Sequence, residues 1–160
     1  RGVPTVYYGD EQGFVGDGGD QDARETLFPS VTAVYNDNDL LGTDRTTAVE
    51  NFRTDHPLYK LIAQLSAIRT NSVALRRGDT VLRAAEDTPG LLAFTRTAGS
   101  DEVLVAVNTS TQPITRNIAV PSATARLHAL AGPCPSAPVA PGTVRITLPP
   151  LGYAICHAAR

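Results

Sequence analysis

The spacing of apolar residues changes near residue 72, and this change limits the folds open to the chain. Before that point the only regular apolar patterns are one short run, Val3–Tyr8, and one helical repeat, Leu58–Ile68. After it, short segments rich in β-branched and aromatic residues follow one another, separated by Gly and Pro. The sequence therefore predicts an α+β chain in two parts, residues 1–71 and residues 72–160.

The first part is expected to hold a strand, a polar loop and helical segments. The run Val3–Tyr8 predicts a buried strand that Gly9 ends, and residues 9–30 are rich in Gly and Asp, which predicts a long loop. A short helix is predicted at Asp44–Phe52. One strand and its helices cannot bury their own apolar faces, so this part is expected to belong to a larger α/β domain.

A longer helix is predicted from residue 57 to residue 71. Its apolar residues repeat at helical spacing and share one face, with Asp55 expected to cap the start and Pro57 tolerated in the first turn. The face consists of Leu58, Leu61, Ile62, Leu65 and Ile68. The chain also holds no Met and begins with Arg1, so we expect it to be a processed or shortened part of a longer protein.

The second part predicts an antiparallel β-sandwich. Its strands are short and turns such as Pro89-Gly90 separate them, while Val103–Val107 is apolar on both faces and should be central. Residues 133–141 contain four prolines and predict an irregular connection. The expected strands are Thr80–Ala85, Leu91–Thr97, Glu102–Asn108, Thr115–Val120, Ala125–Ala129, Thr143–Leu148 and Gly152–His157.

Charge and hydropathy exclude two classes of partner. The chain has 14 Lys and Arg residues against 16 Asp and Glu residues, a net charge of -2, which gives no attraction to a phosphate backbone. We therefore expect no nucleic-acid binding. No apolar run approaches the roughly 18–20 residues that span a bilayer, so no membrane partner is expected either.

Three groups of polar residues each have a functional and a local structural interpretation. Asp17, Asp20 and Asp22 do not match an EF-hand loop, and a solvated loop is the preferred interpretation. Asn108-Thr109-Ser110 matches a glycosylation acceptor, but these residue types also favour turns, and the local interpretation is preferred. Cys134 and Cys156 lack a Cys-x-x-Cys motif, which disfavours zinc; from the residues alone a disulfide and two buried thiols both stay open.

The N-terminal residues carry a family resemblance. Gly2–Gly13 reads GVPTVYYGDEQG and resembles the last barrel strand of the α-amylase family of glycoside hydrolases, whose pattern is G-[IV]-P-x-x-Y-Y-G-x-E-Q. Gly18–Glu25 resembles the G-x-D-x-x-x-R-E segment that follows this strand. Asp55–Ala63 and Ala67–Arg69 resemble the start and end of the last barrel helix. The β-rich tail resembles the C-terminal sandwich of these enzymes, called domain C.

The resemblance implies a fold and an activity. It implies the last β/α unit of a (β/α)8 barrel followed by domain C, in a parent enzyme that hydrolyses α-1,4-glucosidic bonds of starch or maltooligosaccharides with retention. Glu11-Gln12 is closest to the α-amylases among members of the family. The family's catalytic carboxylates come from earlier barrel strands, so no catalytic residue is assigned here. The isolated chain is expected to be inactive without the missing N-terminal barrel segment.

The resemblance also implies site residues. Asp20 and Arg24 match the residues that bind a glucose unit on the non-reducing side, and a salt bridge that only shapes the loop is the alternative for this pair. Among the aromatic residues, the position of Phe14 on the loop makes it the preferred contact to sugar. Asp10 and Glu11 are adjacent acids, which point to opposite faces of an extended segment, so structural roles are preferred. The same alternation predicts that Tyr7 and its neighbour face opposite sides. Two alternatives remain: a transglycosylase of the same family, and a non-catalytic carbohydrate-binding or structural module.

The remaining expectations concern metals and location. No cofactor and no metal ligand are assigned to this chain, whereas the resemblance implies that the full-length parent can bind calcium through upstream residues. An enzyme acting on a polysaccharide is expected to be extracellular. Because export exposes thiols to oxidation, the resemblance favours a disulfide between Cys134 and Cys156.

Overall fold

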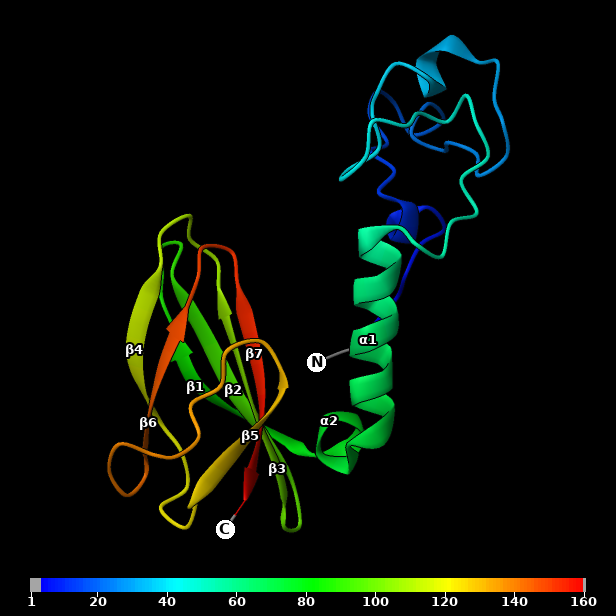
Figure 1. Ribbon diagram of the computed structural model, residues 1–160. Coiled ribbons are helices and arrows are strands. Elements are labelled where there is room, and N and C mark those ends of the chain that lie inside the picture. Colours follow the sequence, from blue (N-terminus) through cyan, green and yellow to red (C-terminus); the bar gives the residue numbers. More distant parts are fainter. Residues whose placement is uncertain (1–3, 160) are drawn as a thin grey trace. The chain divides into compact units, whose positions relative to one another are not determined.

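The computed structural model describes residues 4–159. The chain divides into two compact units, with the boundary between Ala67 and Ile68. The first unit is mostly loop, with two short 3₁₀ helices at Asp10–Gln12 and Ala33–Tyr35. Helix α1 (Pro57–Asn71) contains the boundary between the units, and helix α2 (Val73–Arg77) follows it (Figure 1). The strands are β1 (Asp79–Ala85), β2 (Leu91–Ala98), β3 (Asp101–Asn108), β4 (Ile114–Ala119), β5 (Arg126–Ala131), β6 (Thr143–Leu148) and β7 (Tyr153–Ala159).

The seven strands form two antiparallel sheets. The larger sheet has the order β1-β2-β3-β7-β5, and the smaller one pairs β4 with β6 (Figure 1). Strand β3 is central in the larger sheet because Val103–Val107 is apolar on both of its faces. The predicted antiparallel sandwich is confirmed, with strand bounds that differ from the predicted ones by at most two residues.

The two sheets share one hydrophobic core. Leu104 on β3 and Ile146 and Leu148 on β6 are completely buried, and the smaller sheet covers the larger one with alternate side chains. The core consists of Leu91, Ala93, Leu104, Ala106, Ile114, Ile118, Val120, Leu127, Val144, Ile146, Leu148, Ala154 and Cys156. Burial of these side chains is the main stabilising contribution of the sandwich unit.

Both edge strands of the larger sheet are irregular. The pairing of β1 with β2 shifts between Leu82 and Ala84, and the pairing of β5 with β7 shifts between Ala129 and Ala131. Each shift is typical of a β-bulge, which adds a residue to one strand and increases its twist. The two inner pairings, β2 with β3 and β3 with β7, run without interruption.

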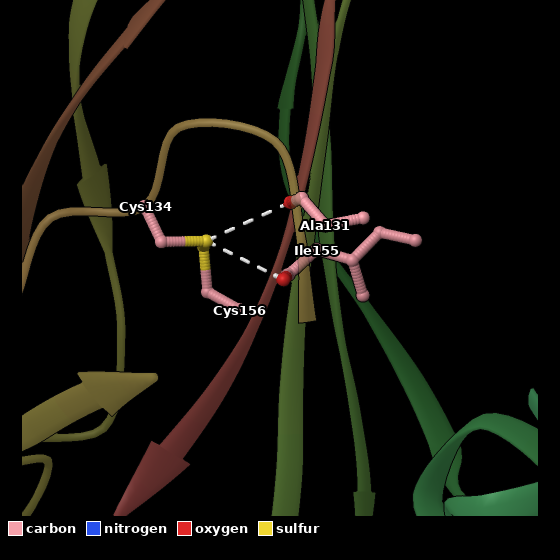
Figure 2. The surroundings of a disulfide bond; sticks show 4 residues. All are labelled: Ala131, Cys134, Ile155 and Cys156. Carbon is pink, nitrogen blue, oxygen red and sulfur yellow. Dashed lines mark hydrogen bonds between the residues drawn. A yellow bond between two sulfur atoms is a disulfide. The ribbon is translucent and has the colours of Figure 1, made fainter. Parts of the chain in front are cut away.

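The two cysteines are bonded to each other. Cys134, in the connection after β5, and Cys156, on β7, have Cα atoms 5.8 Å apart and are separated by 22 residues. Figure 2 shows the oxygens of Ala131 and Ile155 facing the sulfur of Cys134, at 3.9 and 3.4 Å. A disulfide sulfur has no proton to donate, so in the oxidised protein these are van der Waals contacts. The bridge fastens the proline-rich connection to the core.

Helix α2 is attached to the larger sheet by one carboxylate. Asp101 Oδ2 accepts hydrogen bonds from the backbone N–H of Ala74 at 2.8 Å and from the hydroxyl of Ser72 at 3.2 Å. The other oxygen of Asp101 lies 3.1 Å from Nε2 of His157 on β7. Ser72 caps the helix by accepting from the N–H of Leu75 at 3.1 Å. The start of β3 therefore fixes this helix to the sandwich.

Asn108 has a local structural role at the end of β3. It is buried, and its amide donates to the carbonyl oxygens of Gln112 at 2.7 Å and Pro149 at 2.8 Å. Its side-chain oxygen accepts from the N–H of Ser110 at 2.9 Å and from the hydroxyl of that residue at 2.8 Å. The local interpretation of Asn108-Thr109-Ser110 is thus confirmed.

Helix α1 is confirmed, but its predicted cap is wrong. The carbonyl of His56 accepts the first helical bond from Lys60, and its Nδ1 accepts from the N–H of Leu58 at 3.2 Å. Asp55 instead pairs with Arg53, whose guanidinium lowers the pKa of Asp55 to about 2. The predicted apolar face is half-buried, and no residue of α1 is fully buried within the described part of the chain.

In the first unit the predicted strand is not confirmed, and the predicted short helix is wrong. Residues 4–8 form no strand, and no strand lies elsewhere in residues 4–67, so this segment has no neighbour with which to form a ladder. Val3, where the predicted strand begins, lies outside the described residues. The expected helix at Asp44–Phe52 is a series of turns, because Asn51 binds the backbone carbonyls of Thr46 and Val49 with its amide. Within residues 4–159, no helix has both the length and the apolar character required to span a bilayer.

Candidate functional site

The family-like motif ends in a tight turn that its two acids stabilise. Asp10 accepts a hydrogen bond from the N–H of Tyr7 at 2.8 Å, and Glu11 accepts one from the N–H of Gly9 at 3.1 Å. Both carboxylates therefore bind the backbone just before the 3₁₀ helix that contains them, instead of lying on an extended segment. This geometry agrees with structural roles for the two acids.

Phe14 is positioned by Gly9. The N–H of Phe14 donates to the carbonyl of Gly9 at 3.1 Å, and Gly9 has a φ of 94°. A Cβ at Gly9 would lie 2.6 Å from the Phe14 ring, so a larger residue there would displace the ring. Phe14 is half-buried, and one side of its ring packs on the turn.

A cavity of about 170 Å³ lies beside this turn. Tyr7, Tyr8, Phe14 and Glu25 contribute to its lining. An apolar cavity of roughly 150 Å³ holds benzene, so the volume suits one six-membered ring. The two tyrosines line the same cavity with ring centroids 4.5 Å apart, and the prediction that they face opposite sides is wrong because the segment is not a strand.

Asp20 and Arg24 are brought together in the loop that follows. The Arg24 guanidinium lies 2.5 Å from the Asp20 carboxylate, and the two side chains are 59% and 84% exposed, respectively. A turn in which the N–H of Ala23 donates to the carbonyl of Gly19 at 3.0 Å gives the helical spacing. Such an exposed pair contributes little to stability, so both groups remain open to a ligand.

The charge of Arg24 reaches the cavity. A hydrogen bond with the Tyr7 hydroxyl and partial burial raise the pKa of Tyr8, and the Arg24 guanidinium opposes this rise. Tyr8 therefore keeps its proton at neutral pH. In the sequence Arg24 lies between Ala23 and Glu25, which both line the cavity. Phe14, Asp20 and Arg24 thus belong to one local region of the first unit.

Glu25 was not singled out from the sequence, although it ends the motif that contains Arg24. It is 3% exposed, and burial raises its pKa, with Asp17 and Asp37 adding to the rise. Its Oε1 accepts a hydrogen bond from the N–H of Gly16 at 3.2 Å, while its Oε2 has no hydrogen-bond partner within residues 4–159. No group of three or more His, Cys, Asp or Glu residues in the described part of the chain is arranged to hold a metal ion.

Comparison with known proteins identifies the family. Residues 80–155 match the family described as Maltogenic Amylase, C-terminal domain. An α-amylase of Streptomyces lividans is 47% identical over 116 residues, which are 71% of this chain and 13% of that protein. The chain belongs to the α-amylase family. A cyclomaltodextrinase of Geobacillus thermopakistaniensis is 31% identical over 111 residues, 69% of this chain and 15% of that protein.

Solved structures of this family share the fold. A crystal structure of an Anoxybacillus α-amylase is 26% identical, with a TM-score of 0.58 over 71% of this chain and 25% of its own. A debranching enzyme of Nostoc punctiforme is 29% identical, with a TM-score of 0.54 over 64% of this chain and 20% of its own. This chain of the α-amylase family therefore corresponds to a small share of each relative.

Proposed function

We propose that this chain is the C-terminal part of a retaining α-glucan hydrolase that cleaves α-1,4 bonds of starch or maltooligosaccharides. The similarity to the Streptomyces lividans α-amylase supports this activity. One observation supports a substrate-binding role for this chain. Asp20 and Arg24 form an exposed ion pair, and the sequence neighbours of Arg24 line a cavity that contains aromatic side chains. The chain supplies rim and support residues, and the catalytic carboxylates come from the rest of the parent.

The chemistry of the site fits a sugar. A carboxylate such as Asp20 accepts hydrogen bonds from two vicinal hydroxyls, and the Arg24 guanidinium donates to sugar oxygens or orients the carboxylate. The ring of Phe14 and the tyrosine rings offer apolar faces to the flat side of a pyranose. Together these groups would hold one glucose unit away from the bond that is cleaved.

The test is made in the full-length parent with Asp20→Ala. We expect transition-state binding of long maltooligosaccharides to weaken by roughly 1–3 kcal/mol, while short ones that do not reach the site keep their kcat/KM. An equal loss on long and short substrates, together with a lower melting temperature, would instead assign the ion pair to shaping the loop. Asp39→Ala, an exposed change elsewhere in the first unit, is the matched control.

Two assays separate the alternatives. The pure 160-residue chain should release no reducing sugar from soluble starch, because a retaining mechanism needs the missing nucleophile and acid. A cyclomaltodextrin glucanotransferase of Geobacillus stearothermophilus is 33% identical over 110 residues, which makes transglycosylation the second candidate. Transfer products in the full-length reaction would favour it, whereas a full-length protein that binds starch without cleaving it would favour a non-catalytic module.

We also propose that the parent is extracellular and that any calcium it binds is held by upstream residues. The disulfide of Cys134 and Cys156 supports export, since such bonds persist in oxidising compartments. We expect the activity to be recovered from the culture medium. A calcium chelator should remove this activity and leave the melting temperature of the sandwich unit unchanged.

A further inference from the structure

Glu25 closes the loop that carries the ion pair. Its hydrogen bond to Gly16 joins the two ends of residues 16–25, and Asp20 and Arg24 lie between them. Inside the loop the bonds are local, from Ala23 to Gly19 and from Arg24 to Gln21. Among the described residues no other hydrogen bond connects one end of this loop with the other.

The ion pair itself does not hold the loop closed. Both of its side chains are well exposed, and exposed pairs are screened by water and salt. Glu25 is buried, so water does not compete for its hydrogen bond while the loop is closed. The closing contact is therefore the contact of Glu25 with the Gly16 amide.

We propose that Glu25 is a positioning residue that holds Asp20 and Arg24 in the arrangement that binds α-glucan. The inference rests on the proposed function of this loop. Glu25 acts through the backbone, because its Oε1 accepts the hydrogen bond of the Gly16 amide and its Oε2 is buried. Its contact orients the pair before substrate arrives.

The closure depends on the charge of Glu25. The negative charges of Asp17 and Asp37 disfavour ionisation of its carboxyl group. The titratable residues Tyr7, Tyr8 and Asp10 line the same cavity. Gly16 supplies the single hydrogen-bond donor to the carboxyl group. An ionised carboxylate that is buried with one donor is poorly solvated. The Gly16 hydrogen bond favours the ionised carboxylate, but burial outweighs it and raises the pKa of Glu25 in the folded state. The closed loop is therefore fully stable below the ordinary pKa of Glu and loses stability as the pH rises through the raised value.

The test compares Glu25→Gln and Glu25→Ala in the full-length protein. Gln keeps an acceptor oxygen for the Gly16 amide and carries no charge, whereas Ala removes the acceptor. We expect Glu25→Ala to lower the ratio of kcat/KM on long to short maltooligosaccharides about ten-fold, with short-substrate kcat/KM retained. Glu25→Gln should keep the wild-type ratio at low pH and remove its decline at high pH.

Asp22→Asn is the matched control, since it removes an exposed charge from the same loop and leaves the Gly16 contact intact. It should keep the ratio and its pH dependence. Faster amide exchange in residues 16–25 of Glu25→Ala, but not of Glu25→Gln, is expected as a readout independent of activity. An unchanged ratio in Glu25→Ala while Asp20→Ala lowers it would overturn this inference alone. No effect of Asp20→Ala would overturn the proposed substrate-binding role of the loop as well.

Discussion

Removing the disulfide is expected to lower the free energy of unfolding of the sandwich unit by about 3 kcal/mol. Cys134 and Cys156 are separated by 22 residues, and closing a loop of this length restricts the unfolded chain by about that amount in the chain-entropy model. Ala is the suitable replacement at both positions, because Cys156 is completely buried and a Ser there would bury an unpaired hydroxyl.

The assay is thermal unfolding of the 160-residue chain with and without reductant. For a unit of this size each kcal/mol shifts the melting temperature by about 4–8 °C, so the double Ala variant should melt about 12–24 °C lower. Reduction of the wild type should cost slightly less, because the Cys134 thiol regains a proton and can donate it to the oxygen of Ile155, 3.4 Å away. The double variant should not respond to reductant.

Two results would refute this reasoning. Equal loss of melting temperature on reduction in the wild type and in the double Ala variant would show that the reductant acts elsewhere. Two free thiols titrated in the denatured, unreduced wild type would show that Cys134 and Cys156 are not bonded in solution.

Three further predictions concern the sandwich unit. Leu104→Ala should lower the free energy of unfolding by about 2–5 kcal/mol in urea denaturation, because it leaves a cavity in the core, whereas the exposed Val81→Ala should change it little. Asp101→Ala should lower it by about 1–2 kcal/mol through loss of the helix α2 contacts, with a smaller loss for Asp101→Asn, which retains an acceptor oxygen. Expression in a glycosylating host should leave Asn108 unmodified by intact mass, because the folded protein buries its amide.

The sandwich was predictable because its information is local. Most strands show apolar residues at alternate positions. Val103–Val107 is apolar at every position, and this predicts a central strand that is buried on both faces. The pairing of Cys134 with Cys156 was favoured by the family resemblance, since the residues alone left two thiols open. The order of the strands, with β7 between β3 and β5, was not readable from the sequence, because it depends on contacts between distant segments.

The first unit was less predictable because its structure depends on partners. A β-prone run such as Val6–Tyr8 becomes a strand when another strand pairs with it, and none lies in residues 4–67. In the same unit the side chain of Thr47 binds the carbonyl of Tyr35, so turns replaced the predicted helix. The motif residues Asp20 and Arg24 were brought together as their spacing indicated, whereas the burial of Glu25 could be recognised only in three dimensions.

The bulges in the two edge strands affect how copies of this domain meet. A flat edge offers a regular row of N–H and C=O groups on which another molecule can add a strand, and such addition leads to aggregation. Strands β1 and β5 each break that row, at Leu82/Ala84 and at Ala129/Ala131. The larger sheet therefore offers no uninterrupted template at either end, and strand addition to this sheet is disfavoured even where apolar side chains such as Leu82 are exposed.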